Sequence, residues 1–261
     1  FGTFPSIFSQ FSEMVPNLTA TLPINDLDSK SLIPSGIVFC CRFCEFISLY
    51  LHPHSPMDNL PIEKQQVHQD ITWLGVKDKN LSVFDCIMET KYATTYNAYL
   101  IKTTAGYVLC ETCKACYFDH YVQDIKDAIG DLSQIKYLIQ NHTEPDHAGS
   151  IQRLLELIPD LMVISTRTGI TYLNDITNSK FNHKIADDIK EIVIGNKTFQ
   201  FINVPFLHWP DSMHTYLKED KVLFTCDCFG SHYCPKGGIL MSELPKEEES
   251  NYQDALLYYY T

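Results

Sequence analysis

Basic residues are scarce in this chain of 261 residues: Lys and Arg number 20 against 32 Asp and Glu, a formal net charge of −12. Non-specific nucleic-acid binding needs a basic face that neutralises phosphates, and anionic membrane surfaces attract polybasic segments. The composition therefore argues against both partners. Hydrophobic residues at 45% and charged residues at 20% otherwise describe an ordinary globular protein.

A long uncharged apolar run is also missing. The most apolar stretch, residues 36–51, carries Arg42 and Glu45. A membrane-spanning helix needs about twenty largely uncharged residues, so this stretch is too short and too polar. It also lies too far from residue 1 for an ordinary signal peptide. We therefore expect no membrane span.

Cysteine is plentiful, but the spacing of a metal finger is lacking. Cys110, Cys113 and Cys116 invite a zinc or iron–sulfur interpretation. No fourth cysteine follows nearby at finger spacing, and the apolar run before Cys110 predicts a strand with Cys110 in the core. Cys226 and Cys228 flank Asp227, and alternation along a strand would point them away from it. We expect both to be small buried residues.

Periodicity divides the chain into two parts. Residues 1–56 show no helical or strand period, and we expect them to be an extension outside the fold, with Met57 as the natural start. From Ile62 the pattern becomes orderly, which predicts one domain over 57–261. Apolar spacing and turn signals predict hairpins at 96–111, 190–205 and 215–225, strands at 70–76, 82–87, 135–139 and 162–165, and helices at 118–129, 151–158 and 247–260.

The chain is organised around residues 141–150, with the sequence NHTEPDHAGS. A predicted buried strand precedes this stretch and a predicted helix follows it, so His142, Glu144, Asp146 and His147 fall in one tight loop. Functional sites are often built on such loops. Two carboxylates and two imidazoles crowded together are costly when unpaired, and a dipositive ion removes that cost. The spacing favours a metal site over a merely polar surface loop.

Two later residues extend this pattern. His208 stands in the sequence LHWPDSM and Asp227 in CDCFGSH, and each follows an apolar run that predicts a strand. We expect both side chains at the same rim as the HxExDH loop. His232 and His214 also lie in this part of the chain, but their spacing gives them no assigned role.

The three motifs together resemble the diiron domain of flavodiiron proteins, or A-type flavoproteins. The dipeptide Phe84-Asp85, the stretch 95–101 (TYNAYLI) and the strand end 111–114 (ETCK) are also similar to that family. The resemblance covers roughly residues 62–261. It implies a metallo-β-lactamase-like αβ/βα sandwich, an α/β fold of two mixed sheets flanked by helices.

The resemblance also implies the ligand set of two non-haem iron ions. His142, Glu144 and His208 would bind one iron, Asp146 and His147 the other, and Asp227 would bridge them. Hydrolytic relatives normally have His where this chain has Glu144, and they bind zinc. A further hard oxygen donor favours iron or manganese over zinc.

The family's activity sets the expected function and partners. It reduces dioxygen to water or nitric oxide to nitrous oxide, with electrons from FMN in a flavodoxin-like domain. In a head-to-tail homodimer that FMN comes from the neighbouring subunit, and rubredoxin or a flavin reductase supplies the electrons. Iron and low-potential flavin chemistry need a reducing setting, so we expect reduced thiols and a cytoplasmic protein.

The chain departs from the family pattern in two ways. The family has one more ligand His further along than Thr261, and it carries the flavodoxin-like domain, which these residues lack. We therefore expect a C-terminally truncated chain that is inactive by itself. The alternatives are a zinc-dependent hydrolase of the same fold, of thioesterase or lactamase type, and an inactive truncated binding domain.

A second loop resembles a flavin site. Residues 165–171, with the sequence STRTGIT, follow a predicted strand and are similar to the hydroxyl-rich phosphate loop of flavodoxins. The loop falls between predicted metal ligands, where a flavodoxin domain has no room. We therefore predict an ordinary strand-loop-helix at this position.

Overall fold

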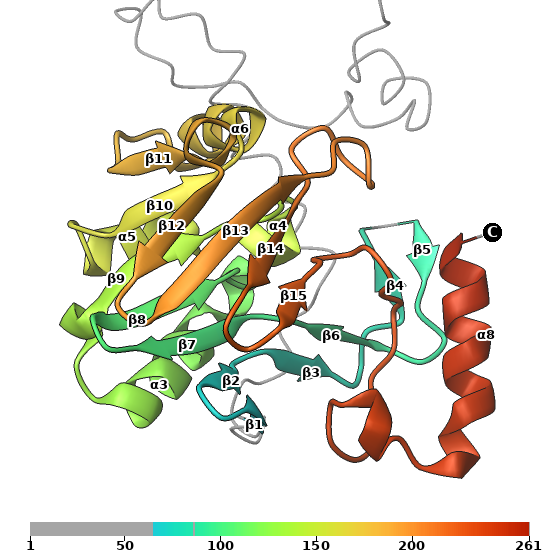
Figure 1. Cartoon of the computed structure of the whole chain (residues 1–261). Coiled ribbons are helices and arrows are strands. Elements are labelled where there is room, and N and C mark those ends of the chain that lie inside the picture. The colour runs from blue at the N-terminus through green and yellow to red at the C-terminus, as the bar shows by residue number, and fades with distance from the viewer. Residues whose placement is uncertain (1–64, 86, 261) are drawn as a thin grey trace, which may run out of the picture. The chain divides into compact units, whose positions relative to one another are not determined.

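The computed structural model describes residues 65–85 and 87–260 (Figure 1). The proposed extension 1–56 and the Met57 start lie outside these residues. A mixed seven-stranded sheet has the order β1-β2-β7-β8-β9-β10-β11. Its strands are β1 (Gln65–His68), β2 (Ile71–Trp73), β7 (Tyr99–Thr103), β8 (Gly106–Cys110), β9 (Ile135–Ile139), β10 (Met162–Ser165) and β11 (His183–Ile185). Pairing is antiparallel from β1 to β8 and parallel from β8 to β11.

The second large sheet is an antiparallel meander with the order β12-β13-β14-β15. Its strands are β12 (Glu191–Ile194), β13 (Lys197–Asn203), β14 (Met213–Leu217) and β15 (Val222–Phe224). Gly195, at φ 57°, forms the first turn, as its position before Asn196 predicted. The resemblance implied a mixed sheet here, but every neighbouring pair is antiparallel. Short turns join β12 to β13 and β14 to β15, and the longer loop 204–212 joins β13 to β14.

Helices cover the outer face of the seven-stranded sheet. They are α3 (Phe118–Ile129), α5 (Ile151–Leu157) and α6 (Arg167–Thr177), with the short α4 (Pro145–Ala148) just before α5. Their apolar stripes bury Tyr121, Ile125, Leu154 and Leu173 against Leu138 and its strand neighbours. This packing follows from the helical period of the apolar residues.

The core between the two sheets forms a separate layer. Ile101, Val108 and Ile139 of the larger sheet pack against Phe199 and Met213 of the smaller one, and all of them are buried. Cys110 lies in this layer, as predicted. The opposite face of the four-stranded sheet exposes Val193, Ile202 and Leu223, so no helix within residues 65–85 and 87–260 covers these side chains.

The remaining elements lie beside the larger sheet's N-terminal strands. Two small sheets pair β3 (Val76–Asp78) with β6 (Thr94–Tyr96) and β4 (Val83–Phe84) with β5 (Met88–Glu89). The helix α8 (Glu249–Tyr260) stands next to the β4–β5 hairpin (Figure 1). The short α7 (Ala186–Ile189) is a single turn just before β12. No helix in the described part of the chain is long and apolar enough to cross a membrane.

Candidate metal centre

The HxExDH loop begins where β9 ends. Gln140 continues the strand by donating its N–H to Ile164 O, and Pro145 then starts α4 at a position that needs no N–H. The chain between these points is tightly held, and His142 and His147 are both buried. The sequence thus places this loop at the edge of a rigid parallel sheet, as predicted.

Four of the predicted side chains form a first group, whose ligand atoms all lie within 4.8 Å of one another. His142 Nε2 is 3.1 Å and His208 Nε2 is 3.3 Å from Glu144 Oε2. Asp227 Oδ2 lies 3.2 Å from His208 Nε2 and 3.7 Å from His142 Nε2. The side chains come from three loops, which end β9, β13 and β15.

A second group shares one residue with the first. Asp146, His147 and Asp227 also bring their ligand atoms within 4.8 Å of one another. His147 Nε2 is 2.7 Å from Asp227 Oδ1 and 3.6 Å from Asp146 Oδ2. Asp227 therefore faces one group with each of its two oxygens. All six predicted side chains meet at one place, and their role as ligands remains a prediction.

Two carboxylates behind the imidazoles fix their orientation. Asp211 Oδ2 lies 3.2 Å from His142 Nδ1, and it also accepts hydrogen bonds from the backbone and hydroxyl of Thr143, both at 2.8 Å. Glu111 Oε2 lies 3.5 Å from His147 Nδ1. Such carboxylate partners hold a metal-binding imidazole so that its other nitrogen faces the ion. Both Nε2 atoms face the centre here.

The sequence interpretation gave neither carboxylate this role, although both lie in quoted motifs. Asp211 belongs to the HWPDSM stretch and Glu111 to the ETCK stretch. Their contacts join residues 69 positions apart for Asp211 and His142, which no local pattern reveals. The available sequence signal was that each carboxylate stands next to an apolar run that predicts a strand, Glu111 just after one and Asp211 just before another.

The charges of the centre are strongly coupled. Burial would raise the pKa of Asp227, but the facing His147 outweighs it and lowers that pKa. Burial would lower the pKa of His147, but Asp146 and Asp227 raise it well above its usual range. Burial likewise opposes the rise in the pKa of His142 to about 9, which the hydrogen bonds of its imidazole to Asp211 and Glu144 cause. Protonated imidazoles thus neutralise the carboxylates, a role that divalent cations also fill.

The donor set fits a pair of divalent metal ions. Each group combines imidazole nitrogen with carboxylate oxygen, and Asp227 is common to both. The buried Asp146 Oδ1 has no hydrogen-bond partner, which leaves a lone pair for an ion. Two-metal sites hold ions about 3.5–4 Å apart and use a bridging ligand. A bridging carboxylate between two groups meets this requirement.

The neighbouring histidines and Trp209 lie around the centre without joining either group. His232 Nδ1 is 3.0 Å from Thr94 Oγ1, and its ring centroid lies 4.5 Å from that of Phe84, with the two rings tilted by 39°. His214 is buried on β14 and belongs to neither group. Trp209 is 39% exposed, and its ring centroid lies 5.3 Å from that of His142. It therefore forms part of the rim instead of packing in the core.

The cysteines of the described residues form no disulfide, and two of them lie elsewhere than the sequence predicted. Cys110, Cys113, Cys116, Cys226, Cys228 and Cys234 are free thiols. The prediction that Cys226 and Cys228 lie buried in a strand is wrong, because β15 ends at Phe224 and both are half-buried in the following turn. Cys226 adopts φ 44° there. This turn is what aims Asp227 at both groups.

The resemblance of residues 165–171 to a phosphate loop does not extend to its hydrogen bonds. The segment is the predicted strand-loop-helix, from β10 into α6. Thr166 Oγ1 accepts from Gly169 N at 3.0 Å, and Asp187 Oδ2 accepts from Arg167 N at 2.7 Å. The first amides of α6 are therefore bonded within the protein.

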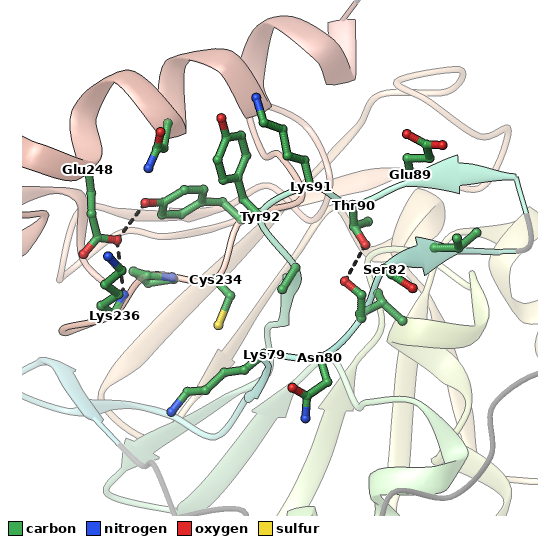
Figure 2. A pocket seen from close by; sticks show the side chains of 16 residues that line it. Lys79, Asn80, Ser82, Glu89, Thr90, Lys91, Tyr92, Cys234, Lys236 and Glu248 are labelled. Carbon is green, nitrogen blue, oxygen red and sulfur yellow. Dashed lines mark hydrogen bonds between the residues drawn. The ribbon is translucent and has the colours of Figure 1, made fainter.

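A separate hollow of about 960 Å³ lies under the start of α8, and none of the six predicted ligands lines it (Figure 2). Polar groups that line the hollow form hydrogen bonds with one another. Tyr233 OH donates to Glu248 at 2.7 Å, and Thr90 Oγ1 donates to Leu81 O at 2.7 Å. Asp254 of α8 accepts hydrogen bonds from Lys91 Nζ and Tyr92 OH, both at 2.9 Å, and these bonds tie the helix to the segment after β5.

The fold is that of a metallo-β-lactamase-like domain, and the two groups that share Asp227 could each hold a metal ion. The model of the ODP family beta lactamase matches residues 94–247. The chain belongs to this family, the metallo-β-lactamase-like domain of flavodiiron proteins. This assignment confirms the resemblance and the αβ/βα fold class deduced from the sequence.

Two curated relatives match this chain over most of its length. The flavo-diiron protein FprA2 of Clostridium acetobutylicum is 44% identical over 197 residues, which cover 73% of this chain and 49% of that protein. The anaerobic nitric oxide reductase flavorubredoxin of Salmonella arizonae is 38% identical over 174 residues, covering 64% of this chain and 35% of that protein. This chain thus spans half or less of the length of these relatives.

A solved structure supports the same fold. Rubredoxin oxygen:oxidoreductase from Desulfovibrio gigas superposes with a TM-score of 0.68 at 26% identity, covering 76% of this chain and 48% of that one.

Proposed function

We propose that this chain is the metal-binding part of an oxidoreductase that reduces dioxygen to water, nitric oxide to nitrous oxide, or both. One observation carries the proposal: Asp227 directs one oxygen to each of two ligand groups, and the first group contains Glu144. The names of the Salmonella and Desulfovibrio relatives, a nitric oxide reductase and an oxygen oxidoreductase, support this reaction class.

The proposed ligand set divides between two iron ions. His142, Glu144 and His208 would hold one iron and Asp146 and His147 the other, with Asp227 between them. Glu144 supplies a hard oxygen donor, which favours iron over zinc at this position. When bound, the two irons supply electrons to a small diatomic substrate and hold it in place.

The other residues orient and enclose the centre. Asp211 and Glu111 hold the two buried imidazoles by their Nδ1 atoms. His208 is 49% exposed at its side chain and Trp209 stands beside it, so the centre is open on this side. A small substrate and an electron donor would approach there.

We infer the cofactor and partners from the family. FMN in a flavodoxin-like domain, contributed by the neighbouring subunit of a head-to-tail homodimer, would pass electrons to the irons. Rubredoxin or a flavin reductase would reduce that FMN. The free thiols of the described residues agree with a reducing, cytoplasmic setting.

A single-turnover experiment tests the proposed reaction. The chain would be loaded with iron without oxygen, reduced chemically, and mixed with substoichiometric nitric oxide or dioxygen in a closed electrode cell. The chemical reductant replaces the electron delivery without which we expect the chain to be inactive by itself. We expect consumption of the gas in proportion to bound iron, and none with Asp227→Asn. Iron-loaded chain that consumes neither gas would contradict the proposal.

Glu144→His separates the redox function from its hydrolytic rival. This substitution restores the residue type of the zinc-binding relatives, so we expect a higher zinc-to-iron ratio after loading from an equal mixture. The wild-type chain should not hydrolyse thioester or lactam substrates with zinc bound. Turnover of such a substrate by the wild-type chain would favour the hydrolase.

A further inference from the structure

Lys114 places a positive charge at the edge of the metal centre. Its ammonium lies 4.4 Å from the centroid of the Phe84 ring and 5.2 Å from that of Tyr96. Asp85 Oδ1 is 3.8 Å away, and the Lys114 side chain is only 16% exposed. Aromatic faces attract cations most strongly where water is excluded. The lysine is therefore held in the wall instead of extending into solvent.

The backbone around Lys114 is fixed against the ligand loop. Thr112 donates its N–H and its hydroxyl to His147 O, at 2.9 and 2.6 Å. Ser150 Oγ donates to Lys114 O at 3.2 Å. A Cβ on Gly149 would stand 2.8 Å from Ala115 N, so the glycine allows this close approach. Lys114 thus moves as one unit with α4, which carries Asp146 and His147.

The charge of Lys114 reaches the carboxylates of the centre. Lys114 Nζ is paired with Asp85, which in turn forms a hydrogen bond with Glu144, and the lysine charge also attracts Asp146. Burial lowers the pKa of His232, and Lys114 adds to that effect. Asp146 belongs to the second ligand group, and the ring of His232 lies against Phe84, which the lysine also contacts. The lysine is therefore an electrostatic neighbour of the second ligand group.

We propose that Lys114 is a positioning residue that supplies a fixed positive charge to the metal pair, weakening the binding of the second cation and raising the reduction potential of the pair. The inference rests on the proposed diiron function. A fixed cation repels a second dication. It also disfavours the oxidised pair, which carries more positive charge than the reduced pair, so its presence favours reduction.

The test compares a neutral and a charged replacement. Lys114→Met removes the charge but keeps an unbranched stem against Phe84 and Tyr96, and Lys114→Arg keeps the charge. Lys126→Met, in the exposed last turn of α3, is the matched control for loss of one charge. Each full-length variant is titrated with Mn²⁺ by calorimetry. The iron-loaded proteins are then titrated potentiometrically, with iron content and circular dichroism measured alongside.

We expect Lys114→Met to bind the second Mn²⁺ at least about threefold more tightly than wild type, since one charge close by acts in a partly screened site. Its iron pair should have a lower midpoint potential at equal iron content. Lys114→Arg should restore both values, and Lys126→Met should change neither. Identical Mn²⁺ titrations of wild type and Lys114→Met would overturn the inference. A wild-type chain that holds fewer than two ions would instead contradict the diiron function.

Discussion

At the scale of single residues, the centre depends on carboxylates that touch no proposed metal. Asp211 is fully buried, and its Oδ2 is near His142 Nδ1 and both polar hydrogens of Thr143. A buried anion with these partners holds the imidazole in one tautomer and one orientation. Glu111 lies behind His147, with its Oε2 3.5 Å from Nδ1 but without a hydrogen bond to it, and its Oε1 accepts from Asn141 N at 2.8 Å. The ligand loop is therefore rigid before any ion binds.

Asp211→Asn should weaken metal binding by about 10- to 100-fold, because the amide keeps the shape but loses the charge that orients His142. Calorimetric titration with Mn²⁺ measures this loss. Asp119→Asn removes an exposed carboxylate that pairs with Arg153 and serves as the control. An unchanged affinity for Asp211→Asn would show that His142 needs no such partner.

The six proposed ligands could be predicted from sequence because their spacing and residue types are local signals. The partners Asp211 and Glu111 could not, because their contacts depend on how distant strands pack. His208 and Asp227 were placed at the rim through the strands before them, and the structure brings both there. The left-handed turn at Cys226, which aims Asp227, had no glycine to mark it.

At the scale of elements, the regular segments followed their periodicity closely. The helix Phe118–Ile129, the strand Ile135–Ile139 and the two later hairpins have the expected positions. The predicted strand at 82–87 is only the pair Val83–Phe84, because Asp85 turns the chain with φ 46°. Alternating apolar residues could not reveal that turn, since Asp adopts it without a glycine.

Gly149 joins two elements of the centre, α4 and the strand end after β8. A Cβ there would lie 2.4 Å from Pro145 O, so Gly149→Ala should destabilise the protein by about 1–3 kcal/mol through forced displacement. Urea unfolding followed by circular dichroism measures this change. Gly237→Ala is the control, because nothing lies within 4 Å of its added Cβ. Equal stability of the two variants would contradict this packing.

Lys197 of β13 links the two large sheets. It pairs with Asp70 in the turn between β1 and β2 and with Asp220 in the turn between β14 and β15. Its ammonium lies 2.6 Å from Asp220 and 2.9 Å from Asp70, and its side chain is 5% exposed. Lys197→Met leaves the buried Asp220 carboxylate without its cation and should lower the free energy of unfolding by about 3–5 kcal/mol. Lys218→Met breaks only the exposed pair with Glu191 and should cost at most about 1 kcal/mol.

The ion pairs of Lys197 with Asp220 and Asp70 predict that stability depends on pH. Burial lowers the pKa of Lys197, but hydrogen bonds to Asp220 and Asp70 raise it above its ordinary 10.5. Because the folded state has the higher pKa, this stabilisation is complete below about pH 10.5 and is lost as the pH rises further. The stability gap between wild type and Lys197→Met should therefore narrow above that pH in urea unfolding. A difference in unfolding free energy that stays constant above about pH 10.5 would show that the charge of Lys197 does not provide this stabilisation.

At the scale of the whole molecule, the fold class followed from the resemblance of the motifs to flavodiiron proteins, but the order of the strands in each sheet could not be predicted. Strand order in the seven-stranded sheet brings β2 beside β7 and β8 beside β9, pairings that periodicity cannot specify. The net charge of −12 argued only against nucleic acids and anionic membranes as partners and indicated nothing about the fold. What the arrangement creates is one edge where three loops meet, and the proposed function depends on that meeting.

Metal content tests this account most directly. The full chain would be purified without oxygen, loaded from an equal mixture of Fe²⁺ and Zn²⁺, desalted, and analysed by plasma mass spectrometry. The account predicts about two iron ions per chain, because two ligand groups share Asp227. Retained zinc with turnover of a thioester or lactam would identify a hydrolase, and retention of neither metal would leave only a binding domain; either result would contradict the diiron assignment.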